Sequence, residues 1–195
     1  MNEMPRIAVI DDEASIRDAA LMVLESAGHE AIAFENGDAF LKDGAQQSWT
    51  LAFLDLKMPG SDGFDVLASL GEGREALPFP IVMISAHADV QAAVRAMKLG
   101  AASFIEKPFS AEDLLGAVDE VQGGDETHAA PDVLEQLTPR EREVAVHLNE
   151  GMTNKEVARA LDCSPRTVEI HRARVLKKLE VRNVAGLVRL MSRIG

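Results

Sequence analysis

Four short apolar runs, each ending abruptly on a charged or hydroxyl-bearing residue, constrain the fold of this chain more than any other feature. The runs end at Asp11, Asp55, Ser85 and Lys107, and a fifth apolar run covers residues 29–34. Between the runs lie helical patterns, with apolar residues spaced three to four positions apart. Strands that alternate with helices predict an α/β domain built on a doubly wound parallel sheet of five strands.

The residues at the ends of these runs predict a site for phosphoryl chemistry. In a doubly wound sheet, ligands bind at the carboxyl ends of the strands, where Asp11, Asp12, Asp55, Ser85 and Lys107 fall. Three neighbouring carboxylates repel one another, and a bound Mg²⁺ ion, which prefers oxygen ligands, relieves that repulsion. A carboxylate oxygen can then attack phosphorus while Mg²⁺ and Lys107 neutralise the phosphoryl oxygens.

Each of these residues also has an ordinary structural explanation when it is taken alone. Asp55 could be a turn residue, Ser85 could bond a backbone group at a strand end, and Lys107 could be a solvated surface lysine. Their convergence on one edge of the sheet favours the functional interpretation.

A segment rich in glycine, proline and acidic residues divides the chain. Residues 123–131 show no apolar periodicity, which is typical of a linker. We therefore expect a first domain at 1–122, a linker at 123–133 and a second domain at 134–195.

The charge changes sign near the same place. Residues 1–136 hold 25 acidic and 8 Lys/Arg residues, a net charge of −17, whereas residues 137–195 hold 7 acidic and 12 Lys/Arg residues, a net charge of +5. A polyanion is therefore expected to meet only the second domain, and a solvated basic face without a ligand is the alternative.

Composition argues against a membrane or secreted protein. The longest uncharged stretch, residues 76–88, has 13 residues and two prolines, short of the ~20 residues that a membrane helix needs. Acidic residues at 11–13 come too early for a secretory signal, and a single cysteine, Cys163, excludes an internal disulfide. We expect a cytoplasmic protein.

The second domain is predicted to be small and all-helical. Helices are expected at residues 138–149, 153–161, 164–179 and 183–193. The first two begin with Thr-x-x-Glu capping boxes, and the third begins with Ser-Pro. Two helices across a tight turn, with basic residues on the second, indicate a helix–turn–helix.

The helix at 164–179 has an apolar face for the core and an opposite face suited to DNA. Small and polar side chains let a helix enter the major groove, and flanking basic residues suit phosphates. His171 lies in the apolar stripe and is interpreted as a packed residue, not a base reader. The residues expected to contact DNA are Arg166, Thr167, Glu169, Ile170, Arg172, Ala173, Arg174, Lys177 and Lys178.

Residues 1–122 resemble the receiver domain of two-component response regulators, which has a flavodoxin-like fold. The resemblance rests on Asp11-Asp12, Asp55 with Met58-Pro59-Gly60, Asp62-Gly63, Ser85-Ala86 and Lys107-Pro108-Phe109, in the family's order. It implies that Asp55 accepts a phosphoryl group from a sensor histidine kinase. It also implies that Asp12, Asp55 and the backbone carbonyl of Lys57 bind Mg²⁺. Asp11 would help through water.

The same resemblance gives roles to the remaining pocket residues. Ser85 and Lys107 would hold the phosphoryl oxygens, and Ser85 and Phe104 would form the switch. The peptide bond Lys107–Pro108 is expected to be cis. The only enzymatic activities implied are Mg²⁺-dependent self-phosphorylation and slow autodephosphorylation at Asp55.

Residues 137–195 resemble the DNA-binding domain of the NarL/FixJ, or LuxR-type, regulators. The matching runs are residues 137–144, 154–158 and 164–171, and the family's groove-facing positions fall on Glu169 and Ile170, with Ala173. Together the two resemblances are closest to the FixJ-like branch. They imply a regulator that, once phosphorylated, binds promoter DNA as a homodimer and regulates transcription, with activation favoured over repression and RNA polymerase as a partner.

Three other classes of protein share parts of this pattern. A haloacid dehalogenase-like phosphatase uses an aspartyl nucleophile, but it needs an acid at the position of Lys57. A phosphorelay module without DNA binding would not need the helix–turn–helix. A sigma-factor-like polymerase subunit would not explain Asp55.

Overall fold

The computed structural model describes residues 5–74, 76–86, 90–122 and 133–194. It divides into two compact units, residues 1–87 with 99–126 and residues 88–98 with 127–195. The linker predicted at 123–133 falls almost wholly outside the described residues. Within the described ranges, no helix combines the length and the apolar character needed to cross a lipid bilayer.

A five-stranded sheet in the order β2-β1-β3-β4-β5 forms the centre of the first unit. All neighbouring strands are parallel, which confirms the predicted doubly wound arrangement. Every residue of β3 and β4 is buried, as expected for central strands covered on both faces. The strands are β1 (Arg6–Ile10), β2 (Glu30–Phe34), β3 (Leu51–Asp55), β4 (Ile81–Ser85) and β5 (Ser103–Glu106).

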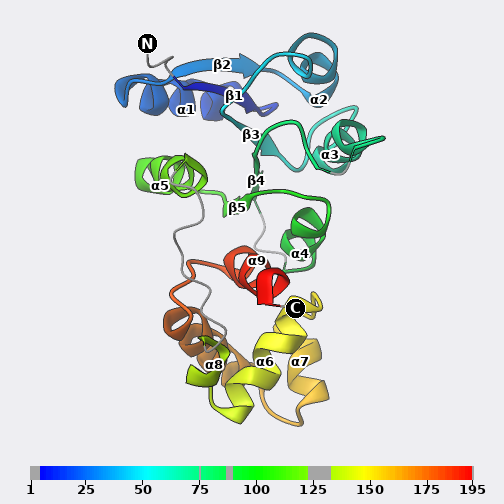
Figure 1. Ribbon diagram of the computed structural model, residues 1–195, viewed down its shortest axis with the longest axis vertical. Helices are drawn as coiled ribbons and strands as arrows, with labels where there is room; N and C mark the ends of the chain where they lie inside the picture. The colour runs from blue at the N-terminus through cyan, green and yellow to red at the C-terminus, as the bar shows by residue number, and fades with distance from the viewer. Residues whose placement is uncertain (1–4, 75, 87–89, 123–132, 195) are drawn as a thin grey trace. The chain divides into compact units, whose positions relative to one another are not determined.

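Helices cover both faces of this sheet. Figure 1 shows α1 (Ala14–Ser26) and α5 (Ala111–Gln122) on one side, and α2 (Gly37–Ala39) and α3 (Gly63–Gly71) on the other. Alternate strand residues point to opposite faces of a sheet, so one set of them packs with α1 and α5. That set comprises Ile7, Val9, Leu51, Phe53, Val82 and Ile84.

The connection between β2 and β3 contains a π-helix that the sequence did not predict. This helix, Phe40–Gly44, follows α2 directly and closes an i→i+5 hydrogen bond at the carbonyl of Phe40. A Cβ at Gly44 would lie 2.5 Å from the ring of Phe40 and 2.8 Å from the ring of Phe34. The indole N–H of Trp49 donates to the carbonyl of Gly44 at 2.9 Å. Aromatic packing therefore sets the backbone path here.

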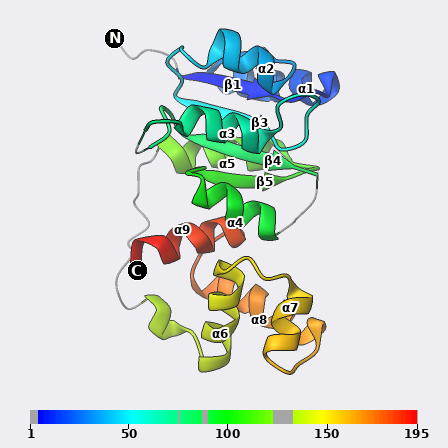
Figure 2. The same ribbon diagram turned by 90° about the vertical axis from the view of Figure 1, so that its right-hand side faces the viewer.

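The regular elements described in the second unit are all helices, joined by short turns (Figure 2). Capping boxes begin α6 and α7, and a serine side chain caps α8, as the sequence predicted. Its elements are α4 (Val90–Lys98), a 3₁₀ turn at Val133–Gln136, α6 (Pro139–Asn149), α7 (Asn154–Ala160), α8 (Pro165–Lys178) and α9 (Val184–Ile194).

One apolar cluster fills the second unit. It buries one stripe of each of α6, α7, α8 and α9 and takes in two valines of α4. Val168 and Val175 anchor α8 in this cluster, and both are fully buried. The opposite face of α8 is therefore turned away from the core.

Gly63, the first residue of α3, lies against the end of β3 so closely that a side chain cannot fit. A Cβ there would lie 2.6 Å from the carbonyl oxygen of Asp55 and 2.9 Å from the Cα of Leu56. Both are backbone atoms that cannot move cheaply. We expect Gly63→Ala to lower the free energy of unfolding of the first unit by about 1–3 kcal/mol.

The matched control is Gly71→Ala at the other end of α3, where the nearest atom to a new Cβ would be 3.8 Å away. Alanine should be neutral there, or stabilising by up to about 1 kcal/mol. Trp49 is the single tryptophan and is buried in the first unit, so its fluorescence during denaturation measures both variants. Equal stabilities for the two variants would contradict the steric argument.

Candidate functional site

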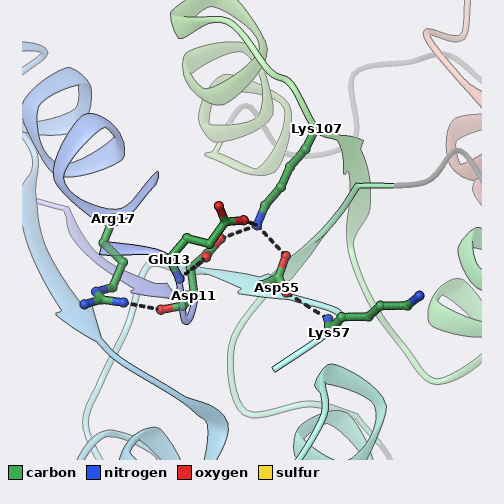
Figure 3. Close-up of polar contacts among 6 residues, drawn as sticks. All are labelled: Asp11, Glu13, Arg17, Asp55, Lys57 and Lys107. Carbon is green, nitrogen blue, oxygen red and sulfur yellow. Dashed lines mark hydrogen bonds and ion pairs between the residues drawn. The ribbon is translucent and has the colours of Figure 1, made fainter. Parts of the chain in front are cut away.

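Three strand ends meet around the ammonium group of Lys107, which follows β5. Its Nζ lies 2.7 Å from Oδ2 of Asp11 and 2.7 Å from Oδ1 of Asp55 (Figure 3). Asp11, Asp55 and Ser85 are 0%, 4% and 3% exposed, so these polar groups lie inside the protein. The predicted convergence of Asp11, Asp55, Ser85 and Lys107 at one edge of the sheet is therefore what the fold produces.

Backbone hydrogen bonds hold the second oxygen of each carboxylate. The N–H of Lys57 donates to Oδ2 of Asp55 at 2.8 Å, and the N–H of Glu13 donates to Oδ1 of Asp11 at 2.9 Å. Each carboxylate thus has one oxygen on a backbone N–H and one on Lys107. Because both oxygens of each carboxylate are held, Asp11 and Asp55 cannot move apart to reduce their repulsion.

Burial and charge act in opposite directions on these groups. Burial raises the pKa of Asp55, although its hydrogen bond and ion pair with Lys107 oppose that change. The negative charge of Asp11 raises the pKa of Asp55 further. For Lys107, burial alone would lower the pKa, but hydrogen bonds with Asp11 and Asp55 outweigh it, and the pKa is raised. Lys107 therefore stays an ammonium group.

Two further residues belong to this site and were not predicted. Glu13 places Oε1 3.5 Å from Nζ of Lys107, and the guanidinium of Arg17 donates to the carbonyl oxygen of Asp11 at 2.7 Å. Glu13 directly follows the two aspartates, so its position was a usable signal. Arg17 lies one helical turn into α1, and only the folded geometry brings it to the carbonyl of Asp11.

The other expected pocket residues are placed as follows. Asp12 is exposed, and Lys57 contacts Asp55 through its backbone N–H, whereas the metal-binding role expected of its carbonyl stays a prediction. Phe104 is buried at 6% exposure in β5. The peptide bond between Lys107 and Pro108 is cis, which confirms that expectation.

The charge of the pocket suits a divalent cation. Asp11 and Asp55 are two buried carboxylates that share one ammonium group, and Glu13 adds a third negative charge at the rim. No group of three or more acidic, histidine or cysteine side chains gathers in metal-binding geometry among the described residues. Mg²⁺ commonly takes only one or two carboxylates and keeps several waters, so the donors present fit it.

The face of α8 opposite the core carries the residues predicted to meet DNA. Ile170 is 44% exposed, and Ala173 and Arg174 are exposed beside it. His171 is half-buried, and within the described residues its Nδ1 has no hydrogen-bond partner, in keeping with a packed histidine. The predicted contacts comprise exposed Arg166, Glu169, Ile170, Ala173, Arg174 and Lys177 and half-buried Thr167, Arg172 and Lys178.

Two ion pairs on α8 differ in kind. Arg166 and Glu169 are 3.1 Å apart, with side chains 81% and 50% exposed, so the pair contributes less than about 1 kcal/mol and can open. Lys178 places Nζ 2.7 Å from Oε2 of Glu141, a carboxylate only 4% exposed, and also donates to the carbonyl of Gln136. Sequence reasoning missed this partner, and a phosphate contact by Lys178 stays a prediction.

Other cations of the second unit also bond the protein itself. The guanidinium of Arg140 donates to the carbonyl of Leu161, and that of Arg142 donates to the carbonyl of Leu134. Together with Lys178, these cationic side chains donate hydrogen bonds to carbonyl or carboxylate oxygens of the protein itself.

Two family models match the chain and together span most of it. Residues 7–119 match "Response regulator receiver domain", and residues 135–191 match "Bacterial regulatory proteins, luxR family". The transcriptional regulatory protein FixJ of Bradyrhizobium diazoefficiens is 38% identical over 203 residues, covering 100% of this chain and 98% of that protein. The tetrathionate response regulatory protein TtrR of Salmonella typhimurium is 33% identical, covering 98% and 94%.

Solved structures give the same likeness. A crystal structure of full-length FixJ from B. japonicum has a TM-score of 0.56 at 38% identity, covering 98% of this chain and 97% of that one. A complex of the two-component response regulator RcsB with DNA has a TM-score of 0.56 at 20% identity, covering 99% and 100%, and shows a shared fold alone.

The pKa of Glu141 gives a test of its pair with Lys178. The hydrogen bond from Lys178, helped by the backbone N–H of Thr138, lowers that pKa from 4.5 to about 2. Stability from this shift is fully present above about pH 4.5 and is lost as the pH falls toward 2. We expect Glu141→Gln to destabilise the second unit at pH 7 by at most about 3 kcal/mol, and the difference from the unsubstituted protein to shrink below pH 4.5.

Glu143→Gln is the matched control, because the side chain of Glu143 is 52% exposed and pairs with Arg140 at the surface. Circular dichroism follows the unfolding of both units, whereas fluorescence of Trp49 follows the first alone. A pH-independent deficit for Glu141→Gln would show that its carboxylate does not carry the shifted pKa.

Proposed function

The chain belongs to the two-component response regulators that join a receiver domain to a LuxR-type DNA-binding domain, and from this premise we propose that Asp55 accepts a phosphoryl group from a sensor histidine kinase and thereby controls promoter binding. The observation that carries the proposal is the Lys107 ammonium held between the buried carboxylates of Asp11 and Asp55.

The proposed transfer uses residues of this pocket. An oxygen of Asp55 forms a P–O bond as the P–N bond of the kinase phosphohistidine breaks, and the histidine nitrogen keeps the electron pair. Lys107 and the hydroxyl of Ser85 bind phosphoryl oxygens, so the charge that moves onto Asp55 arrives beside a fixed cation.

The proposed transfer also uses a bound Mg²⁺ ion. Asp12, Asp55 and the carbonyl of Lys57 are the proposed Mg²⁺ ligands, and Asp11 acts through water. Mg²⁺ supplies positive charge to the phosphoryl oxygens when it is bound. The same site accounts for self-phosphorylation by small phosphodonors and for slow autodephosphorylation, without making the protein a conventional enzyme.

Phosphorylation acts on the rest of the receiver through two switch residues. Ser85 at the end of β4 moves toward the phosphoryl group, and Phe104 in β5 repacks in response. The receiver is then a two-state element whose population shifts when the phosphoryl group is present.

The exposed face of α8 reads promoter DNA. Glu169, Ile170 and Ala173 meet base edges, and the neighbouring arginines, together with Lys177, meet phosphates. One recognition helix reads few base pairs, so a homodimer on two half-sites supplies the specificity. At the promoter the dimer acts as an activator with RNA polymerase as its partner.

Substitution of the acceptor tests the chemistry. Incubation with acetyl phosphate and Mg²⁺ should add one phosphoryl group to the chain by intact mass, and Asp55→Asn should abolish the addition because an amide cannot attack phosphorus. Asp43→Asn, at an exposed acid of the same unit, is the control and should label normally. Full labelling of Asp55→Asn would transfer the role to another residue.

Sedimentation velocity tests dimerisation. Residues 1–136 carry a net charge of −17, so two receivers repel each other at rest, and activation must offset that repulsion. Beryllofluoride, which mimics a phosphoryl group, should convert monomer to dimer. It should also raise the affinity for a palindromic duplex about tenfold or more, because dimerisation raises the local concentration of the second DNA-binding domain. A loaded monomer that binds DNA more tightly would rule out dimerisation as the cause.

A further inference from the structure

We propose that Arg140 and Glu141, neighbours in the first turn of α6, form a bracket that holds the turn before α8 and the C-terminal end of α8, and so fixes the angle at which α8 enters DNA. They act as positioning residues, and Lys178 belongs to the bracket. The inference rests on the proposed reading of DNA by α8. It adds residues that lie outside the DNA-contacting face of α8 yet determine the sequence preference of that face.

Glu141 holds the end of α8. Its Oε2 accepts from Nζ of Lys178 at 2.7 Å and from the backbone N–H of Thr138 at 2.9 Å. Nζ of Lys178 donates again, to the carbonyl of Gln136 at 3.1 Å. Two hydrogen bonds from Lys178, the last residue of α8, therefore go to the first turn of α6 and to the 3₁₀ turn before it, and the Glu141 side chain that accepts one of them is almost fully buried.

Arg140 holds the turn that leads into α8. One guanidinium nitrogen donates to the carbonyl of Leu161, the C-cap of α7, which no intrahelical N–H can satisfy. Asp162 follows with a positive φ of 48°, so the chain reverses tightly here before Ser164 caps α8. A second nitrogen of Arg140 pairs with Glu143 at 2.9 Å, which fixes the guanidinium on α6.

These bonds matter because they add directional constraints to the apolar packing of α8. Val168 and Val175 bury α8 against the core, but apolar contact is non-directional and tolerates small rotations. A helix of 14 residues is about 21 Å long, so a tilt of ten degrees moves one end by about 3–4 Å. That exceeds the tolerance of a hydrogen bond to a base edge, so directional bonds at both ends are needed to keep the readout.

Two adjacent lysines make the proposal testable. Lys177 and Lys178 carry the same charge at the end of α8, but Lys177 is exposed while Lys178 bonds Glu141. If Lys177 meets a phosphate, its loss weakens binding to all sequences and reduces the salt dependence. If Lys178 serves the bracket, its loss reduces the preference between sequences and leaves the salt dependence unchanged.

The experiment uses the full chain loaded with beryllofluoride. Dissociation constants are measured over a series of salt concentrations, for a duplex selected from genomic fragments and for a shuffled duplex of equal length. We expect Lys178→Met to lower the preference for the selected duplex about tenfold or more. The slope of log affinity against log salt concentration should stay that of the unsubstituted protein. Lys177→Met should weaken both duplexes alike and reduce the slope by about 0.9, the value for one lost phosphate contact.

Further variants separate positioning from folding. Lys178→Arg keeps the charge and the donors and should restore most of the preference, whereas Glu141→Gln should lose it as Lys178→Met does. Circular dichroism at the assay temperature checks that each variant is folded. If Lys178→Met unfolds, the double variant Glu141→Gln/Lys178→Met, which leaves no uncompensated buried charge, replaces it and should show the same loss of preference.

Two results would overturn the bracket. Lys178→Met could reduce the slope and keep the preference, which would make Lys178 a phosphate contact, or it could change neither quantity. If the unsubstituted chain prefers no sequence at all, the proposed function fails before any variant is compared, and the bracket fails with it.

Discussion

The pocket depends on the ion pairs that the Lys107 ammonium group makes with two aspartates, because they allow two carboxylates to be buried side by side. Asp11 and Asp55 are each 2.7 Å from that ammonium group, and each is nearly inaccessible to solvent. Without that cation, burial and mutual repulsion would favour protonation of one acid, and a protonated acid is a poor nucleophile. The parallel sheet supplies the geometry, since it brings separate strand ends to one edge.

The same local design recurs in the second unit with a different outcome. Glu141, like Asp55, has a buried carboxylate that accepts from one lysine and from one backbone N–H. Burial dominates at Asp55, whose pKa is raised, whereas the hydrogen bond from Lys178 dominates at Glu141, whose pKa is lowered to about 2. The first arrangement makes the Asp55 carboxylate more basic, whereas the second keeps Glu141 ionised at neutral pH as a structural anchor.

What the sequence could predict was local, and what it could not predict depended on distant contacts. Apolar runs that stop at Asp11, Asp55 and Lys107 identified the strands and the pocket, and the Thr-x-x-Glu patterns identified the helix starts. The π-helix at Phe40–Gly44 was missed because aromatic packing imposes it. The partner of Lys178 was missed because 37 residues separate it from Glu141, and charge counting cannot pair such groups.

Internal use of positive charge has a kinetic consequence. Arg140, Arg142 and Lys178 bond protein oxygens, so they add to the net charge of residues 137–195 while giving DNA less than the count implies. Weaker electrostatic attraction shortens each encounter with non-specific DNA, so the protein dissociates and samples other sites sooner. Since non-specific sites vastly outnumber true ones in a genome, a domain that commits part of its charge to internal oxygens spends less time on random sequence.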